Sequence, residues 1–123
     1  MKASISELLA WGPVLTDGAW GSELIRQDYR KGQCLEHWNL EFPERVEAIA
    51  RGYIRAGSRV ILTNTFGANR YLLEKHRLAN RVREINAAGV AISKKKSGRR
   101  PGGGFRFHGS QRQAVFHEAG DRG

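Results

Sequence analysis

The sequence predicts a parallel α/β fold, and the main indication is two stretches that change abruptly from apolar to polar residues. Residues 60–62 are a short apolar run that leads directly into the polar residues 63–65. Residues 14–16 likewise lead into Asp17 and Gly18. Buried parallel strands have this apolar character and carry polar groups at their carboxyl ends. A predicted helix separates the two stretches, as it does in a βαβ unit.

Two short helices are predicted before the middle of the chain. Ser4 and Glu7 have the spacing of a capping box, so a helix to about Ala10 is expected. Residues 22–27 follow a glycine-flanked loop and can form a second short helix. Residues 29–40 are expected to be irregular.

A longer helix is predicted to begin at Pro43, because proline is favoured in the first turn of a helix. Gly57, after Ala56, suits the position just past the helix end, where a left-handed backbone is common. A strand over residues 59–63 follows. The apolar residues of the helix fall on one stripe at helical spacing: Val46, Ile49, Tyr53 and Ile54.

Two further helices are predicted after the second strand. Residues 71–76 form a short one, for which Asn69 is the expected cap, and residues 80–93 form a longer one. The right-handed crossover rule places the two long helices on the same side of the sheet. The apolar face of the last helix comprises Val82, Ile85, Gly89 and Ile92.

The last thirty residues lack this organisation. Residues 94–123 contain eight Lys/Arg, two Asp/Glu and seven Gly, and their apolar residues follow neither strand nor helix spacing. This composition is typical of disordered arginine- and glycine-rich sequence, and also of an out-of-frame translation of GC-rich DNA. The abrupt change within a predicted helix favours the second interpretation. The chain is therefore divided into residues 1–93, an α/β part, and residues 94–123, a basic tail.

Composition limits the classes of function. The 123 residues suffice for one ordinary domain, and most of the formal net charge of +9 lies in the tail. Cys34 is the only cysteine, which excludes an intramolecular disulfide. No apolar run approaches the ~20 residues of a membrane span, and the first residues lack a signal-peptide core. We therefore expect a cytoplasmic protein without a membrane partner.

Polar residues at the two strand ends are the candidate ligand-binding groups. Asp17 could accept hydrogen bonds from a ligand ammonium group or cap the following turn, and Gly18 would let backbone approach a ligand closely. Thr63 and Thr65 are expected to point to one side and Asn64 to the other. Each of these could contact a ligand or cap the next helix. Strand ends of this kind form the ligand-binding face of βα barrels.

The remaining candidates receive structural interpretations. Cys34, His37 and His76 are too few and too poorly spaced for a structural zinc site, which needs four ligands. The aromatic residues expected in the core are Trp38, Phe42 and Tyr53. An arginine- and glycine-rich tail with few aromatic residues is weak evidence for RNA binding, so nucleic acid is not an expected partner.

Six motifs stand out across residues 10–94; they lie at residues 17–24, 37–40, 43–46, 53–58, 63–69 and 82–86. In their order and spacing they closely resemble the homocysteine S-methyltransferase family. The family includes the homocysteine-binding module of cobalamin-dependent methionine synthase and the betaine- and S-methylmethionine-dependent enzymes.

The resemblance implies a (β/α)8 TIM barrel that transfers a methyl group from a donor to the homocysteine sulfur, giving methionine. It implies zinc as the cofactor, since zinc coordination turns a thiol into the more nucleophilic thiolate. It also implies that Asp17, with Gly18 beside it, helps to bind the homocysteine amino group. Thr63 and Asn64 would line the homocysteine pocket, and Phe66 would form part of its wall.

The chain departs from the family pattern in its metal ligands. The family holds zinc with three cysteines, of which one follows a later strand and two are adjacent in a glycine-rich motif near the end of the domain. Cys34 matches none of them. About two of the eight βα units are present, whereas a complete barrel needs ~250 residues. The expected structure is therefore an incomplete barrel with a disordered basic tail. We expect this chain alone to be marginally folded, to bind no zinc and to be inactive.

Three interpretations of function remain. In the first, the chain is the N-terminal piece of a homocysteine methyltransferase, shortened by a frameshift or a gene-model error. In the second, it is a small basic protein that binds nucleic acid through its tail. In the third, it is a fragment that pairs with a separately encoded remainder. The string of motifs favours the first. Neither the methyl donor nor the oligomeric state can be inferred from the sequence.

Overall fold

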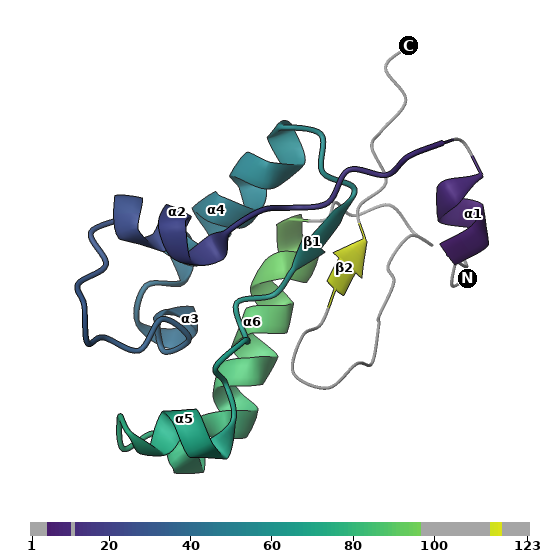
Figure 1. Ribbon diagram of the computed structural model, residues 1–123. Coiled ribbons are helices and arrows are strands. Elements are labelled where there is room, and N and C mark those ends of the chain that lie inside the picture. Colours follow the sequence, from purple (N-terminus) through teal and green to yellow (C-terminus); the bar gives the residue numbers. More distant parts are fainter. Residues whose placement is uncertain (1–4, 11, 97–113, 117–123) are drawn as a thin grey trace.

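A computed structural model describes residues 5–10, 12–96 and 114–116 (Figure 1). Helices dominate this part of the chain. The helices are α1 (Ile5–Leu9), α2 (Trp20–Arg26), α3 (Trp38–Glu41), α4 (Pro43–Arg55), α5 (Arg70–Glu74), the 3₁₀ turn η1 (Ala79–Arg81) and α6 (Val82–Lys96). The strands are β1 (Val60–Leu62) and β2 (Ala114–Phe116).

The first predicted strand, residues 14–16, is reduced to one isolated bridge, in which Thr16 pairs in parallel with Val60. The prediction of a strand was wrong in extent. Leu15 is 55% exposed, so this apolar run is not buried between two layers. The parallel direction was right, and the backbone bonds from Asp17 N to Val60 O and from Arg59 N to Leu15 O hold the two segments together.

The second predicted strand, residues 59–63, is confirmed as β1. Gly57, with φ of 103°, ends α4 as expected. The amides of Gly57 and Ser58 donate to the carbonyls of Ile54 and Tyr53 in the pattern of a Schellman motif, which turns the chain directly into β1. Ile61 at the centre of β1 is fully buried.

β2 comes from the basic tail and pairs antiparallel with β1, with Ile61 opposite Val115. Residues 94–96 continue α6, so this helix runs past the predicted boundary at residue 93. Residues 97–113 and 117–123 lie outside the described residues, as does Ser4, the expected cap of α1. The expectation that the tail is disordered or out of frame therefore stays a prediction.

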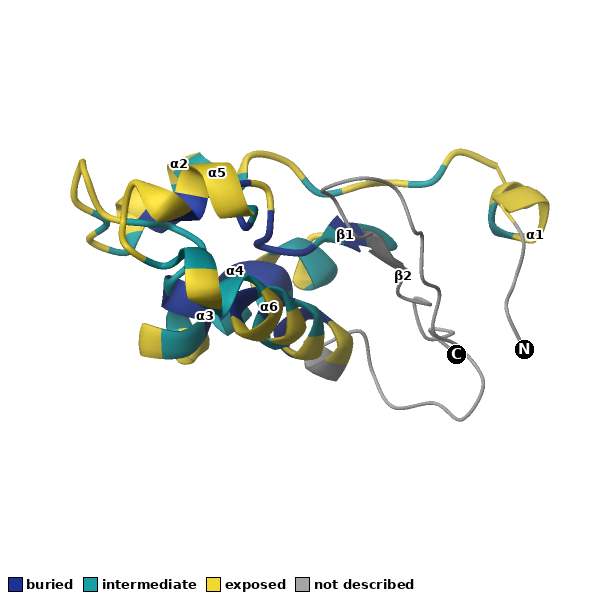
Figure 2. Cartoon of the chain, turned by 90° about the horizontal axis from the view of Figure 1, so that it is seen from below, coloured by how far each residue is buried: buried dark blue, intermediate teal, exposed yellow. Residues whose placement is uncertain are grey.

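The core lies between α2, α3, α4 and α6, where the darkest ribbons of Figure 2 meet. The two long helices, α4 and α6, pack against each other. The predicted aromatic core is confirmed, because Trp38 is 1% exposed and Phe42 and Tyr53 pack against its cluster. The buried members of the main cluster are Leu24, Trp38, Val46, Ile49 and Ile92.

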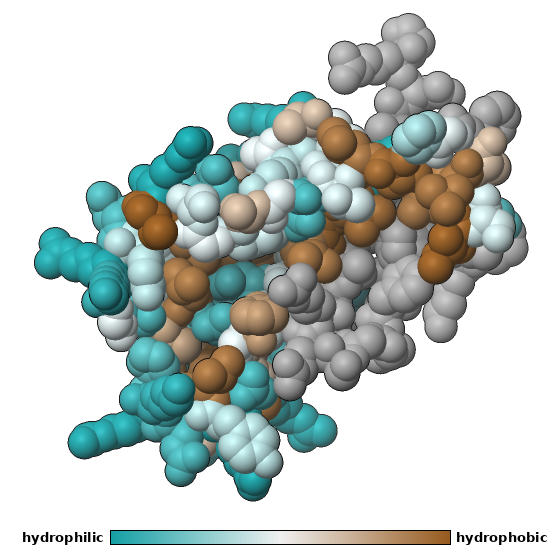
Figure 3. All heavy atoms as spheres, in the orientation of Figure 1, coloured by the Kyte–Doolittle hydropathy of each residue, from teal (hydrophilic) through white to brown (hydrophobic). Residues whose placement is uncertain are grey.

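α1 lies at one end of the molecule and buries none of its residues (Figure 1). Apolar side chains gather at this end (Figure 3), where Ile5, Leu9 and Leu15 are all more than half exposed. The stable part of the fold therefore begins near Thr16 rather than at α1.

The described residues confirm an α/β arrangement in which helices dominate, and they do not close a barrel. Residues 29–40 are irregular only up to His37, because α3 begins at Trp38. Asn69 caps α5 as predicted, since its side chain accepts from the amide of Leu72. Among the helices described, none has the length and apolar character needed to cross a membrane.

Candidate functional site

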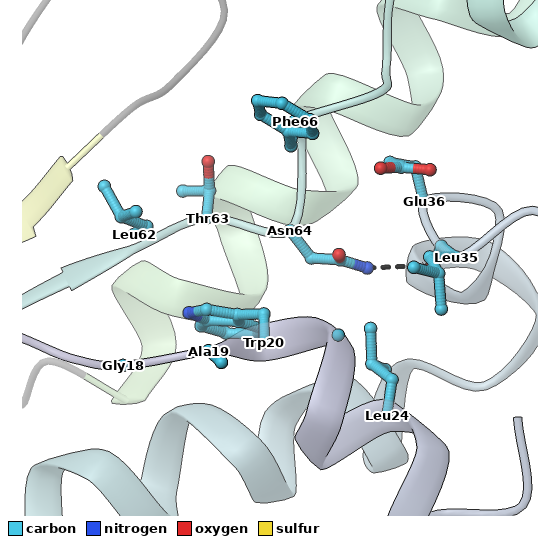
Figure 4. A pocket seen from close by; sticks show the side chains of 11 residues that line it. Gly18, Ala19, Trp20, Leu24, Leu35, Glu36, Leu62, Thr63, Asn64 and Phe66 are labelled. Atoms are coloured by element: carbon cyan, nitrogen blue, oxygen red, sulfur yellow. Dashed lines mark hydrogen bonds between the residues drawn. The ribbon is translucent and has the colours of Figure 1, made fainter.

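A pocket of about 310 Å³ lies between the loop that opens α2 and the chain that leaves β1 (Figure 4). Its volume is at the lower end of the ~300–1,000 Å³ typical of small-molecule sites. Four of the five residues predicted for the site line it, and Asp17 does not. The lining residues are Gly18, Ala19, Trp20, Gly21, Leu24, Leu35, Glu36, Leu62, Thr63, Asn64 and Phe66.

Asp17 does not line the pocket but holds two residues that do, Trp20 and Leu62. Its Oδ2 accepts a hydrogen bond from Trp20 Nε1 and another from the amide of Leu62, both at 2.7 Å. Asp17 thus joins the loop that opens α2 to the end of β1. Since both bonds reach Oδ2, Oδ1 has no bonded donor within the described part of the chain.

Gly18 follows Asp17 and lies against Tyr53. A Cβ at position 18 would lie 3.1 Å from the Tyr53 hydroxyl oxygen, which donates to the carbonyl of Ala19 at 3.0 Å. The lack of a side chain at position 18 therefore lets α4 support this loop.

Thr63 and Thr65 point to the same side, as the alternation of an extended chain predicts. Their hydroxyl oxygens are 2.7 Å apart and hydrogen-bonded, and both side chains are buried. Ser93 of α6 donates to the carbonyl of Leu62 just before them. Thr63 therefore contributes to the pocket from a rigid position at the end of β1.

Asn64 points the other way and holds the opposite wall. Its Nδ2 donates to the carbonyl of Leu35 at 2.9 Å and to Oδ1 of Asn39 at 3.0 Å. Asn39, on α3, donates in turn to the carbonyls of Asn64 and Ile85. Both N–H donors of the Asn64 side chain are thus committed to the protein, and the residue also lines the pocket (Figure 4).

Phe66 forms the outer rim of the pocket. Phe66 lines the pocket and is 60% exposed, so it stands at the opening to solvent. Trp20, which lines the same pocket, is held in place by Asp17. An apolar ligand chain could therefore lie between two aromatic side chains.

Glu36 is the charged residue among the seven lining residues that the sequence analysis did not predict. Its Oε1 accepts from the amide of Gly67 at 2.8 Å. A Cβ at position 67 would lie within 3.1 Å of all three carboxyl-group atoms of Glu36, so the two segments meet at van der Waals contact. Glu36 lies in a stretch that was expected to be irregular, and no local sequence pattern marks it as a pocket residue.

Comparisons with known proteins agree with the site. The model of the family described as homocysteine S-methyltransferase matches residues 14–102, which is more than half of the chain. The chain belongs to this family. The matched range contains every residue that lines the pocket.

This chain is similar to two methionine synthases. The protein from Mycobacterium tuberculosis is 33% identical over 95 residues, and the one from Mycobacterium leprae is 34% identical over 95 residues. Each match covers 72% of this chain and 8% of the relative. The chain thus spans less than a tenth of the length of these curated relatives.

The residues described here do not fit the zinc site that the family resemblance implies. Three cysteines are needed, and the chain has only Cys34. Its Sγ donates to Oε2 of Glu36 at 3.7 Å, and burial raises the pKa of the thiol. His37 pairs instead with Glu41. No group of three His, Cys, Asp or Glu side chains that could hold a metal ion occurs in the described ranges.

Proposed function

We propose that this chain supplies the homocysteine-binding rim of a homocysteine S-methyltransferase. The observation that carries the proposal is the pocket formed where the family motifs at residues 17–24 and 63–69 come together. The parallel pairing of Thr16 with Val60 brings these motifs together at the end of β1, the kind of position at which βα folds bind ligands. The family membership supplies the chemical identity of that ligand.

Each predicted site residue has a distinct role in this proposal. Asp17 takes part in binding the amino group through Oδ1, and Gly18 brings the loop backbone close to the ligand. Thr63 and Asn64 line the part of the pocket next to β1. Phe66 covers the aliphatic chain of the ligand.

The reaction proposed for the whole family member is transfer of a methyl group to the homocysteine sulfur, and zinc, when bound, would hold that sulfur as the more nucleophilic thiolate. The residues of this chain bind and orient the amino acid, and the zinc ligands and the donor site come from elsewhere. This chain alone therefore binds homocysteine without methylating it. We also propose that the protein acts in the cytoplasm, where a single cysteine such as Cys34 stays reduced.

Calorimetric titration of the purified chain with L-homocysteine under reducing conditions tests the proposal. We expect one binding site with a millimolar or lower Kd. Phe66→Ala should weaken binding, whereas Tyr71→Ala should not, because Tyr71 is 72% exposed and does not line the pocket. Absence of binding, or equal binding by both variants, would refute the proposal.

A separate assay tests the claim of inactivity. The chain is incubated with homocysteine, zinc and S-methylmethionine, betaine or methylcobalamin as donor. We expect no methionine above the level of the protein-free reaction. Methionine formed in proportion to the chain would show that the missing ligands are not needed.

A further inference from the structure

We propose that the carboxylate of Glu36 is a binding group for the ammonium group of the amino-acid ligand. This inference deepens the proposed function and rests on it. It concerns a residue for which neither the sequence motifs nor the family comparison assigns a role.

The charge of the pocket is the first observation. Glu36 carries the single charged side chain among the residues that line it, and the others are apolar, aromatic, small or neutral polar. One carboxylate in a half-enclosed apolar pocket favours a cationic group, because the surrounding side chains screen the charge less than water does. A homocysteine molecule has one cationic group, its ammonium.

The hydrogen bonds of Glu36 are the second observation. Oε1 is occupied by the amide of Gly67 at 2.8 Å, and this bond fixes the direction of the carboxylate. The contact of Oε2 with Cys34 Sγ, at 3.7 Å, is a weak hydrogen bond. A carboxylate can accept about four hydrogen bonds, so Glu36 keeps capacity for a strong donor.

The position of Glu36 is the third observation. Figure 4 shows its carboxylate extending from the loop before α3 toward the segment that carries Phe66, while Leu62 and Thr63 lie on the other side of the pocket. The bond to Gly67 links Glu36 to the same segment. An ammonium group bound at Glu36 would therefore place the aliphatic chain of the ligand across the pocket, beneath Phe66.

The role of Asp17 differs from that of Glu36. Asp17 lies outside the pocket lining, and its Oδ2 holds Trp20 and the amide of Leu62. Loss of Asp17 should disturb the pocket itself, whereas loss of the Glu36 charge should affect only ligands that carry an amino group.

The test compares two ligands on the purified full chain: L-homocysteine and 4-sulfanylbutanoate, which has the same thiol and carboxylate but no amino group. Glu36→Gln keeps a side-chain oxygen for the amide of Gly67 and removes the charge. We expect about a 10- to 100-fold weaker affinity for homocysteine and an unchanged or tighter affinity for 4-sulfanylbutanoate. Glu74→Gln, at an exposed site on α5, is the matched control and should change neither affinity.

The outcomes separate the two proposals. If the unaltered chain binds neither ligand, the proposed function itself fails. If it binds homocysteine but Glu36→Gln weakens both ligands equally, Glu36 has only a structural role and the inference is overturned. It is also overturned if Glu36→Gln changes neither affinity.

A measurement on the unaltered chain covers the case in which Glu36→Gln does not fold. The side-chain carboxyl carbon of Glu36 and the amide of Gly67 are followed by NMR during titration with each ligand. We expect both signals to shift with homocysteine and the carboxyl signal to remain in place with 4-sulfanylbutanoate. Equal shifts with both ligands contradict the inference.

Discussion

The side-chain amides of Asn39 and Asn64 face each other and are hydrogen-bonded, with Asn64 Nδ2 donating to Asn39 Oδ1 at 3.0 Å. Asn39 Nδ2 donates back to the carbonyl of Asn64 at 2.8 Å and to the carbonyl of Ile85 at 3.1 Å. Both side chains are buried. This pair connects α3, the end of β1 and α6, three elements that are far apart in the sequence, directly behind the pocket.

Replacement of Asn39 should therefore destabilise the fold. Asn39→Ala leaves a buried amide and two buried carbonyls without their partner, and each unsatisfied group costs about 1–3 kcal/mol. We expect urea-induced unfolding to occur at a clearly lower concentration. Asn39→Asp should be worse, since it turns a donor into a charged acceptor that faces carbonyl oxygens. Retention of the original midpoint by either variant would contradict the importance of this pair.

Gly89 allows α6 to pack closely on this pair. A Cβ at position 89 would lie 2.8 Å from Asn39 Nδ2 and 2.8 Å from Thr65 Cγ2. Alanine is favoured over glycine in a helix by about 1 kcal/mol, but overpacking of this kind costs about 1–3 kcal/mol. We expect Gly89→Ala to lower the free energy of unfolding.

Gly52 provides the matched control for Gly89. It lies within α4, and a Cβ there would meet no atom within 4 Å. Gly52→Ala should therefore raise the free energy of unfolding by up to about 1 kcal/mol through helix propensity alone. We therefore expect the free energy of unfolding to fall in Gly89→Ala and to rise in Gly52→Ala when both are measured in the same denaturation experiment. Stabilisation by both would show that α6 can move away from Asn39.

Loss of the Asp17 carboxylate should release Trp20. Asp17→Ala removes the acceptor of the indole N–H and of the Leu62 amide, and we expect a loss of about 1–3 kcal/mol in stability. In NMR spectra the Nε1–H signal of Trp20 should move toward its position in an unfolded chain. Trp38 is an internal reference, because its Nε1 has no partner among the described residues. Equal movement of both signals would indicate general unfolding.

The reactivity of Cys34 should depend on pH and on Glu36. Burial, and to a smaller extent the charge of Glu36, raises the pKa of the thiol above its ordinary value of 9.0. The thiolate is the reactive form, so alkylation by iodoacetamide near pH 9 should be slower than in the urea-unfolded chain. Glu36→Gln should lower the pKa and speed the reaction, while Glu74→Gln should leave it unchanged.

The same shift predicts the direction of the pH dependence of stability. The folded thiol has a higher pKa than the unfolded one, so its contribution is fully present below the unfolded pKa. It is lost as the pH rises through the folded pKa, because ionisation is easier in the unfolded chain. We therefore expect stability to fall above about pH 9, and less steeply in Cys34→Ala. An identical decline in both proteins would exclude this cause.

The sequence predicted best those elements whose ends and faces are both marked by local residues. α4 has Pro43 at its start, Gly57 after its end and a continuous apolar stripe, and its observed bounds agree within a residue. α3 has four residues and no such marks, so it was missed. The strand at residues 14–16 was overestimated because pattern alone does not reveal whether an apolar run has neighbours on both faces.

The site was predictable to the extent that it lies at strand ends. Thr63 and Asn64 follow β1 directly, and the parallel arrangement brings Gly18 beside them. Glu36 could not be found in this way, because it reaches the pocket from an irregular loop. Its place depends on a tertiary contact with Gly67, 31 residues away, and that contact leaves no local pattern.

The two edges of β1 are both occupied. Residues 15–17 bond to the edge that carries the carbonyl of Val60 and the amide of Leu62, and β2 pairs along the opposite edge in the antiparallel direction. A parallel sheet that continues past β1 needs that opposite edge for its next strand. Residues 114–116 and any incoming parallel strand therefore compete for the same backbone groups, and assembly of this chain with the remainder of a barrel would require the tail to be displaced first.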